Sequence, residues 1–242
     1  WTATDLSGNT ASATQIISVV DTTAPVIQTL KPFSFEATSK SENIFVLPII
    51  EYVDNTEISS ITNDAPNSFE YGTTIVTWTV LDISGNLSIS EQEVHVIDTT
   101  APSITIPKDV QIEATTIDTN IVEFGSAEAS DLVEISSITN DAPEVFPLGE
   151  TIVTWTATDL SGNTASATQF ISVVDTTAPV IEKPQDITMD ATSQNNNTVN
   201  LDTIDVIESI SDVSITNDAP LYYNFGETIV TWTATDLSGN TA

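Results

Sequence analysis

The sequence predicts an all-β protein built from tandem immunoglobulin-like β-sandwich modules that recur at one constant spacing. The four tryptophans, Trp1, Trp78, Trp155 and Trp232, are equally spaced along the chain with a period of 77, and so strict a period is the signature of a repeat protein. Within each period, short runs of β-branched residues are separated by turn-forming residues about every ten positions, as in a β-sandwich. Helical periodicity is absent.

Three further motifs keep the same period and mark the modules. Asp-Thr-Thr-Ala-Pro begins at positions 21, 98 and 175, and Asn-Asp-Ala-Pro begins at 63, 140 and 217. Asp-Leu-Ser-Gly-Asn begins at 5, 159 and 236, with Ile as its second residue at 82–86. We therefore predict, in order, the C-terminal strands of a partial repeat at 1–21, modules at 22–98 and 99–175, and a module at 176–242 that lacks its last strand.

The second module shows the expected strands most clearly. Its pattern predicts seven strands that run alternately up and down. In the strand at 151–158, Val153, Trp155 and Ala157 share one face and threonines occupy the other. Trp155 is therefore expected to anchor a core rather than to stack on a ligand. The seven strands are expected at 103–106, 110–114, 121–124, 135–139, 144–147, 151–158 and 165–174.

Composition excludes several classes of partner. The chain has 35 Asp and Glu against four Lys and Arg, and its formal net charge is −31. Such a surface repels nucleic acid and anionic lipid and attracts cations. There is no cysteine to form disulfides, and no apolar run reaches the length of a membrane span. A chain with 40% hydrophobic residues can nevertheless bury real cores.

The repeated acidic motifs predict calcium sites where modules meet. Alternating strands place the loops before strands one, five and seven at one pole, and the third-to-fourth-strand loop of the preceding module, which carries Asp54, is expected to face that pole. Crowded carboxylates without a cationic neighbour repel one another, and calcium takes six to eight oxygen ligands. The candidate ligands are Asp21, Asp54, Asp64, Asp82, Asp98, Asp131, Asp141, Asp159, Asp175, Asp218 and Asp236.

Other interpretations of these acids remain open or are disfavoured. Asp-Leu-Ser-Gly-Asn is also ordinary hairpin chemistry, in which Asp bonds the turn backbone and Gly takes positive φ. Paired carboxylates can indicate a glycosidase, but acids that recur at the end of every module do not form one shaped pocket. We therefore predict that the protein is not an enzyme. His95 has no counterpart in the other modules and is expected to face solvent.

The opening Asp-Thr-Thr-Ala-Pro, the Gly-Glu-Thr-Ile-Val-Thr-Trp-Thr-Ala-Thr-Asp-Leu-Ser-Gly-Asn stretch and the closing Val-Val-Asp resemble the HYR (hyalin repeat) domain along the whole chain. That resemblance implies an immunoglobulin-like fold and an extracellular or cell-surface role in adhesion, matrix or filaments. The chain is also similar to calcium-stiffened immunoglobulin-like repeats of large bacterial adhesins, which implies linker ligands at Asp21, Asp98 and Asp175. The third module departs from this pattern with Glu208 in place of Asp54 and Asp131.

Three functions follow as hypotheses. The first is a calcium-stiffened stalk or filament of neighbouring repeats or copies. The second is an adhesin that binds cell-surface glycans or ice through exposed aromatics or a flat threonine face. The third is a filament in which the segment Ser12 to Val20 of one copy completes the third module of another by strand addition. The simpler alternative to the third is that the sequence is cut from a longer chain of similar modules.

Overall fold

The computed structural model describes all residues, 1–242, and its eighteen strands confirm the predicted all-β class. No helix in it could cross a membrane. The chain divides into two compact units. Unit 1 comprises Trp1–Thr100 with Asp131–Glu134 and Leu160–Asn163, and unit 2 comprises Ala101–Ser130, Ile135–Asp159 and Thr164–Ala242. Each unit is described by itself.

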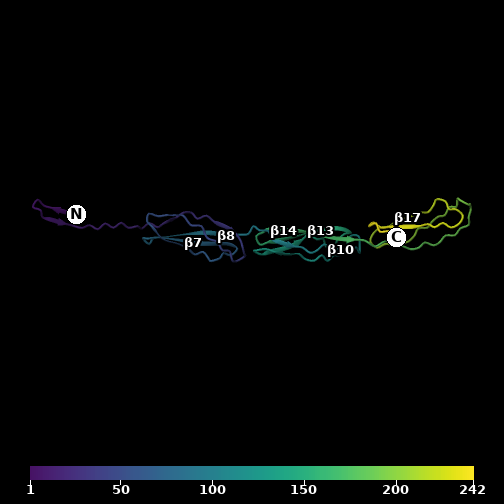
Figure 1. Cartoon of the computed structure of the whole chain (residues 1–242), viewed down its shortest axis with the longest axis horizontal. Coiled ribbons are helices and arrows are strands. Elements are labelled where there is room, and N and C mark those ends of the chain that lie inside the picture. The colour runs from purple at the N-terminus through teal and green to yellow at the C-terminus, as the bar shows by residue number, and fades with distance from the viewer. The chain divides into compact units, whose positions relative to one another are not determined.

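The main sheet of unit 1 has four strands in the order β4-β8-β7-β6. They are β4 (Phe33–Glu36), β8 (Leu87–Ile97), β7 (Gly72–Asp82) and β6 (Ile58–Asn63), and the long hairpin β7–β8 lies at its centre (Figure 1). A small second sheet pairs β3 (Val26–Ile27) with β5 (Tyr52–Val53) antiparallel. Near the N-terminus, β1 (Thr2–Thr4) and β2 (Thr10–Ser12) form a separate hairpin.

Unit 2 contains an equivalent sheet, built from the next copies of the same motifs. Its four strands are β10 (Val110–Glu113), β14 (Thr164–Val174), β13 (Gly149–Asp159) and β12 (Ile135–Asn140), and β9 (Ser103–Thr105) pairs with β11 (Glu128–Ser130). The rest of the unit holds two two-stranded sheets. These pair β15 (Val180–Ile181) with β16 (Val206–Ile207), and β17 (Ser214–Asn217) with β18 (Trp232–Thr235).

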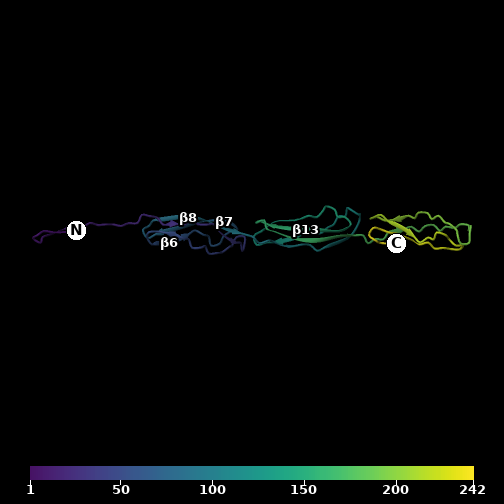
Figure 2. The same cartoon turned by 90° about the horizontal axis from the view of Figure 1, so that it is seen from above.

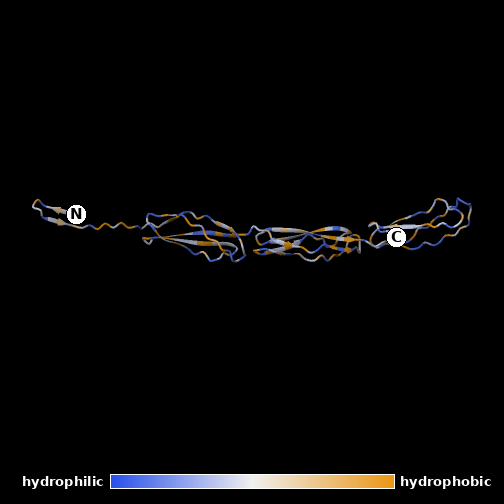
Figure 3. Cartoon of the chain, in the orientation of Figure 1, coloured by the Kyte–Doolittle hydropathy of each residue, from blue (hydrophilic) through white to orange (hydrophobic).

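The core follows from alternation along the long hairpins. In β13, Val153, Trp155 and Ala157 are buried while the intervening threonines are not, because successive side chains of a strand point to opposite faces. Figure 3 shows the resulting mixture of apolar and polar stretches along the strands. The indole N–H of Trp155 donates to Oε1 of buried Gln169 at 3.0 Å. Trp155 is therefore a core anchor, as predicted.

Two of the seven strands expected in the second module are wrong. Residues 121–124 and 144–147 form no strand, and only an isolated bridge joins Asn120 to Phe146. The buried amide of Asn120 replaces the missing ladder: its oxygen accepts the N–H groups of Thr115 and Thr116, and its nitrogen donates to the carbonyl of Phe146. The strand forms instead at Glu128–Ser130.

The expected alternation of strand direction is also wrong at one edge. β4 pairs parallel with β8, and β10 pairs parallel with β14. The strand expected over residues 12–20 is limited to Ser12, which ends β2, and Ile16, Ile17 and Val19 are exposed. The module boundaries at 21, 98 and 175 and the strand addition proposed for the third module stay predictions.

Candidate metal centre

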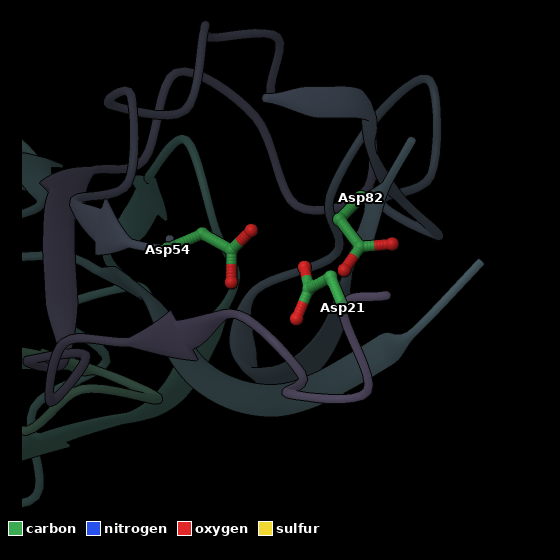
Figure 4. A group of neighbouring side chains, drawn as sticks. All are labelled: Asp21, Asp54 and Asp82. Carbon is green, nitrogen blue, oxygen red and sulfur yellow. The ribbon is translucent and has the colours of Figure 1, made fainter. Parts of the chain in front are cut away.

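Three aspartates of unit 1 bring their carboxylates together. Asp21 precedes β3, Asp54 follows β5 and Asp82 ends β7. One carboxylate oxygen from each lies within 4.8 Å of those of the other two, and Figure 4 shows the groups turned toward one another. Asp82 is buried and the other two are half-buried. We call Asp21, Asp54 and Asp82 the aspartate triad.

Pairing of β3 with β5 puts Asp54 in this group. Val26 lies opposite Val53 in the antiparallel ladder, so the residue that follows β5 lies beside the chain that leads into β3. Asp54 thus meets Asp82 of its own module and Asp21, which directly precedes that module. The expectation that the loop carrying Asp54 lies at the opposite pole, facing the next module, is wrong.

Asp21 is held as an ionised acceptor. Its Oδ1 accepts the N–H of Thr23 at 2.9 Å and the amide of Asn55 at 3.2 Å, and its Oδ2 accepts the hydroxyl of Thr56 at 2.8 Å. These donors, led by the Thr23 N–H, lower the pKa of Asp21 below its usual value. Asp21 is therefore charged at neutral pH.

Asp82 is fixed by the turn that follows β7. Its Oδ1 accepts the backbone N–H of Asn86 and its Oδ2 accepts the Asn86 side-chain amide, both at 2.8 Å. Gly85 takes a φ of +93°, which other residues rarely adopt. The hairpin chemistry expected of this motif is thus present. Asn86 also donates to the backbone carbonyl of Asp21 at 3.4 Å, which ties the turn to the module entrance.

Asp54 leaves one oxygen without a partner. Its Oδ2 accepts the N–H and the hydroxyl of Thr56, at 3.0 and 2.9 Å, whereas Oδ1 is buried and has no hydrogen bond. A buried acceptor without a donor costs about 1–3 kcal/mol, and more for a charged group. An oxygen of this kind beside two further carboxylates is suited to a cation.

The Asn-Asp-Ala-Pro loops do not join the triad. Asp64 Oδ1 accepts the backbone N–H of Thr77 at 2.6 Å, and Asp141 and Asp218 make the same bond to Thr154 and Thr231. The ladder pairs Asn63 with Trp78 in the middle of β7, and the stretch of strand from Thr77 to Asp82 spans roughly 16 Å. The expected convergence of this loop with the others is wrong because of this register.

The equivalent acids one period further along the chain are distributed over both units. In unit 1, oxygens of Asp98 and Asp131 lie within 4.8 Å of each other. Asp98 is buried, and its carboxylate accepts the N–H of Thr100 at 3.0 Å and the hydroxyl of Ser161 at 3.1 Å. In unit 2, Asp159 ends β13 and is buried, at the position that Asp82 occupies in β7.

The third set of acids lacks this arrangement. Asp175 accepts the hydroxyl of Ser238 at 3.0 Å, and both oxygens of Asp236 accept from Asn240 at 2.8 Å. Glu208 turns onto its own backbone, where Oε1 accepts the N–H groups of Ser209 and Ile210 at 2.7 and 3.0 Å. The departure expected at Glu208 therefore changes the geometry as well as the residue.

Two further acids with a shared role, Glu36 and Glu113, were not predicted from the sequence. Glu36 ends β4, and its carboxylate accepts the N–H of Thr99 at 2.7 Å and the hydroxyls of Thr99 and Thr100. Glu113 ends β10 and makes the same contacts with Thr176 and Thr177. The hydrogen bond from the backbone N–H is the largest cause that lowers the pKa of each glutamate, and the hydroxyls lower it further. The repeated Glu-Ala-Thr of residues 36–38 and 113–115 was the available signal.

Comparison with known proteins identifies a domain family and two relatives to which this chain is similar. Residues 97–173 match the HYR domain family. This segment belongs to that family. The whole chain is 36% identical over its length to hyalin of Strongylocentrotus purpuratus, and 33% identical over 98% of its length to hyalin of Lytechinus variegatus. It spans 22% and 49% of the lengths of these two relatives.

Solved structures give a more distant likeness to this HYR chain. The extracellular cadherin domains 1–4 of protocadherin gamma B7 are 14% identical, with a TM-score of 0.34. That comparison covers 90% of this chain and 74% of the protocadherin chain.

Proposed function

We propose that this HYR chain is part of an extracellular, non-enzymatic adhesive or structural repeat protein, and that its modules bind calcium at the aspartate triad and at the pair Asp98 and Asp131 of unit 1. The observation that carries the proposal is the buried, unpartnered Oδ1 of Asp54 beside two further carboxylates. The similarity to hyalins supports the extracellular placement and the structural role.

Calcium fits the donor set better than other common cations. The chain has no cysteine and a single histidine, so it lacks the ligands that zinc prefers. The triad supplies carboxylate oxygens from two loops and the end of β7, and a hard cation with six to eight oxygen ligands accepts such a set. Magnesium binds through fewer protein oxygens and keeps several waters.

A bound cation acts on the entrance of the module. Asp21 belongs to the Asp-Thr-Thr-Ala-Pro segment that leads into β3, whereas Asp54 and Asp82 belong to the module body. Without a cation, mutual repulsion of the carboxylates opposes their approach. Calcium removes that repulsion and fastens the entering segment to the body. Repeated along an array, this restraint stiffens the protein into a stalk or filament.

Calorimetry tests the proposal directly. The melting temperature of the chain is measured with calcium and with EDTA, for the wild type, Asp54→Asn and Glu91→Gln. A ligand that binds only the folded state raises the melting temperature, so we expect a rise for the wild type and a smaller one for Asp54→Asn. Glu91 is exposed on β8, and its variant removes the same charge and keeps the full rise. Equal melting temperatures with and without calcium in the wild type contradict the proposal.

A glycan- or ice-binding face receives less support. In unit 2, Thr154, Thr156 and Thr158 of β13 lie opposite Thr168, Ser166 and Thr164 of β14. In unit 1 the equivalent partners of Thr77 and Thr79 are Glu91 and Ile89, so the hydroxyl face does not recur. Trp78 and Trp155 are buried and offer no ring for stacking. Binding of a single isolated module on a glycan array would favour this alternative.

A further inference from the structure

We propose that the outer edges of β6 and β12 are self-association sites, at which the chain pairs with the same edge of a second copy to form one continuous antiparallel sheet. The occupant of each edge is thus another copy of this chain. The proposal is independent of the metal centre.

The edge is free on its outer side. β6, which Figure 2 labels, and β12 are the last strands of their sheets, and most of their residues are exposed. The N–H of Asp64 donates to the carbonyl of Thr77 at 3.3 Å, and antiparallel alternation continues this inward bonding at Thr62 and Ser60. The backbone groups of Ile61 and Asn63 therefore point outward. No backbone segment outside the ladder with β7 bonds residues 59–63.

The edge carries a register shift, which is one of the usual protections against pairing, but it has neither a charge nor a proline. Natural edge strands are blunted by bulges, lysine, proline or inward-pointing charge. Both β6 and β12 read Ile-Ser-Ser-Ile-Thr-Asn, without a charge or a proline. A register shift between Ile58 and Ser60 leaves the strand regular from Ser60 onward. In a chain of net charge −31, these neutral strands are where two copies repel each other least.

One register satisfies both the hydrogen bonds and the charges. A residue whose backbone N–H and C=O point outward must pair with a residue of the second copy that has the same orientation. A two-fold axis at Ile61 places this residue opposite Ile61 of the second copy. Ser60 then faces Thr62, and Asn63 faces Ser59, the residue at the register shift, so the regular pairing is confined to residues 60–62. No carboxylate lies opposite another, which avoids the destabilisation caused by like charges across strands. The same register is available at Ile138, because the two hexapeptides are identical.

A contact of this kind is self-complementary. The same patch is used by both copies, as in most dimers with two-fold symmetry. Each chain carries the edge twice, so one contact raises the effective concentration for further contacts wherever the geometry permits. The interaction is weak at a single edge and grows with the number of modules.

Sedimentation equilibrium of the whole chain tests this inference. The measurement is made in EDTA at an ionic strength of about 0.15 M, where the screening length is about 8 Å. We expect the wild-type average mass to rise with concentration above the 25.8 kDa of the single chain. The double variant Ile61→Pro, Ile138→Pro removes two outward N–H donors and is expected to stay monomeric.

The matched control is Ile61→Ala, Ile138→Ala, which loses the same side chains but keeps the donors. It is expected to associate like the wild type. A wild type that remains monomeric at millimolar concentration overturns the proposal, and so does a proline variant that associates as strongly as the alanine variant.

A spin label gives a second measurement that needs no proline. The chain has no cysteine, so Thr62→Cys introduces a single site for a nitroxide. Paired strands lie about 4.8 Å apart, so we expect label-to-label distances of about 10–20 Å between copies. The same label at Ser166→Cys, on the sheet face of unit 2, is expected to give no such short distance. Absence of short distances at Thr62→Cys overturns the proposal.

Discussion

The carboxylate of Glu36 accepts the backbone N–H of Thr99 at 2.7 Å, although the two residues lie 63 positions apart. This bond fastens the start of the next Asp-Thr-Thr-Ala-Pro segment to β4. Because β4 is held parallel to β8, Glu36 lies where β8 ends and that segment begins. The linker is thus held by a glutamate at this point as well as by the aspartate that opens the motif.

Acid is expected to release this bond. Hydrogen bonds, led by the one from Thr99, lower the pKa of folded Glu36 below its ordinary value of 4.5. At a pH between these two pKa values, the unfolded chain therefore binds more protons than the folded chain. The stabilisation is complete above the ordinary pKa and is lost as pH falls through the lowered one. We expect wild type and Glu36→Gln to differ in urea-unfolding free energy at pH 7 and to converge once the pH has fallen below the lowered pKa of Glu36. A constant difference from pH 7 to 3 in EDTA contradicts this, and Glu91→Gln serves as the control.

Thr56 connects two members of the aspartate triad through a single hydroxyl. Its Oγ lies 2.8 Å from Asp21 Oδ2 and 2.9 Å from Asp54 Oδ2. Thr56→Val keeps the shape and removes the donor, so we expect a loss of about 1–3 kcal/mol in EDTA and a weaker response to calcium. Thr56→Ser retains the hydroxyl and is expected to behave like the wild type. Equal stability of the valine and serine variants in urea unfolding would count against this.

The buried glutamines are expected to contribute unequally. Gln169 accepts from Trp155 and donates to the carbonyls of Lys108 and Phe124, whereas Gln92 accepts from Trp78 and donates only to Lys31. Replacement by Leu leaves the indole N–H and the backbone carbonyls that contact each glutamine without a hydrogen bond. Gln169 has one more such partner, so Gln169→Leu should destabilise the chain by about 1 kcal/mol more than Gln92→Leu. Chemical denaturation followed by tryptophan fluorescence measures both. A larger loss for Gln92→Leu is the contrary result.

Asn120 is expected to be the most sensitive asparagine of the second module. It is almost completely buried and bonds the backbone of Thr115, Thr116 and Phe146. Asn120→Ala leaves several buried groups unpaired, and we expect a loss of about 2–4 kcal/mol. Exposed Asn196→Ala is the control and should change stability by less than about 0.5 kcal/mol. A comparable melting temperature for the two variants would contradict the role assigned to Asn120.

Local patterns in the sequence were sufficient for the long hairpins. In β7 and β13 the alternation of Val, Trp and Thr identifies the buried face, because strand side chains alternate strictly. The Asp82 turn was predictable for a similar reason, since Asp, Gly and Asn each have a known place in such turns. Asn120 was missed because a side-chain amide that replaces a ladder leaves no strand alternation, although Asn43, Asn120 and Asn197 recur with the same spacing as the tryptophans. The strands expected at 121–124 and 144–147 were wrong for that reason.

By itself, the sequence determined the all-β class, the equal spacing of the tryptophans, the place of Trp78 and Trp155 in the core and the acidity that attracts cations. Only the tertiary structure decided which acids meet. Asp54 joins Asp21 because two very short strands, β3 and β5, pair antiparallel, and strands that short carry no pattern. Asp64 is kept away by the register of β6 on β7. Register and pairing depend on contacts between distant segments, so repeated motifs identify candidate ligands without showing which of them converge.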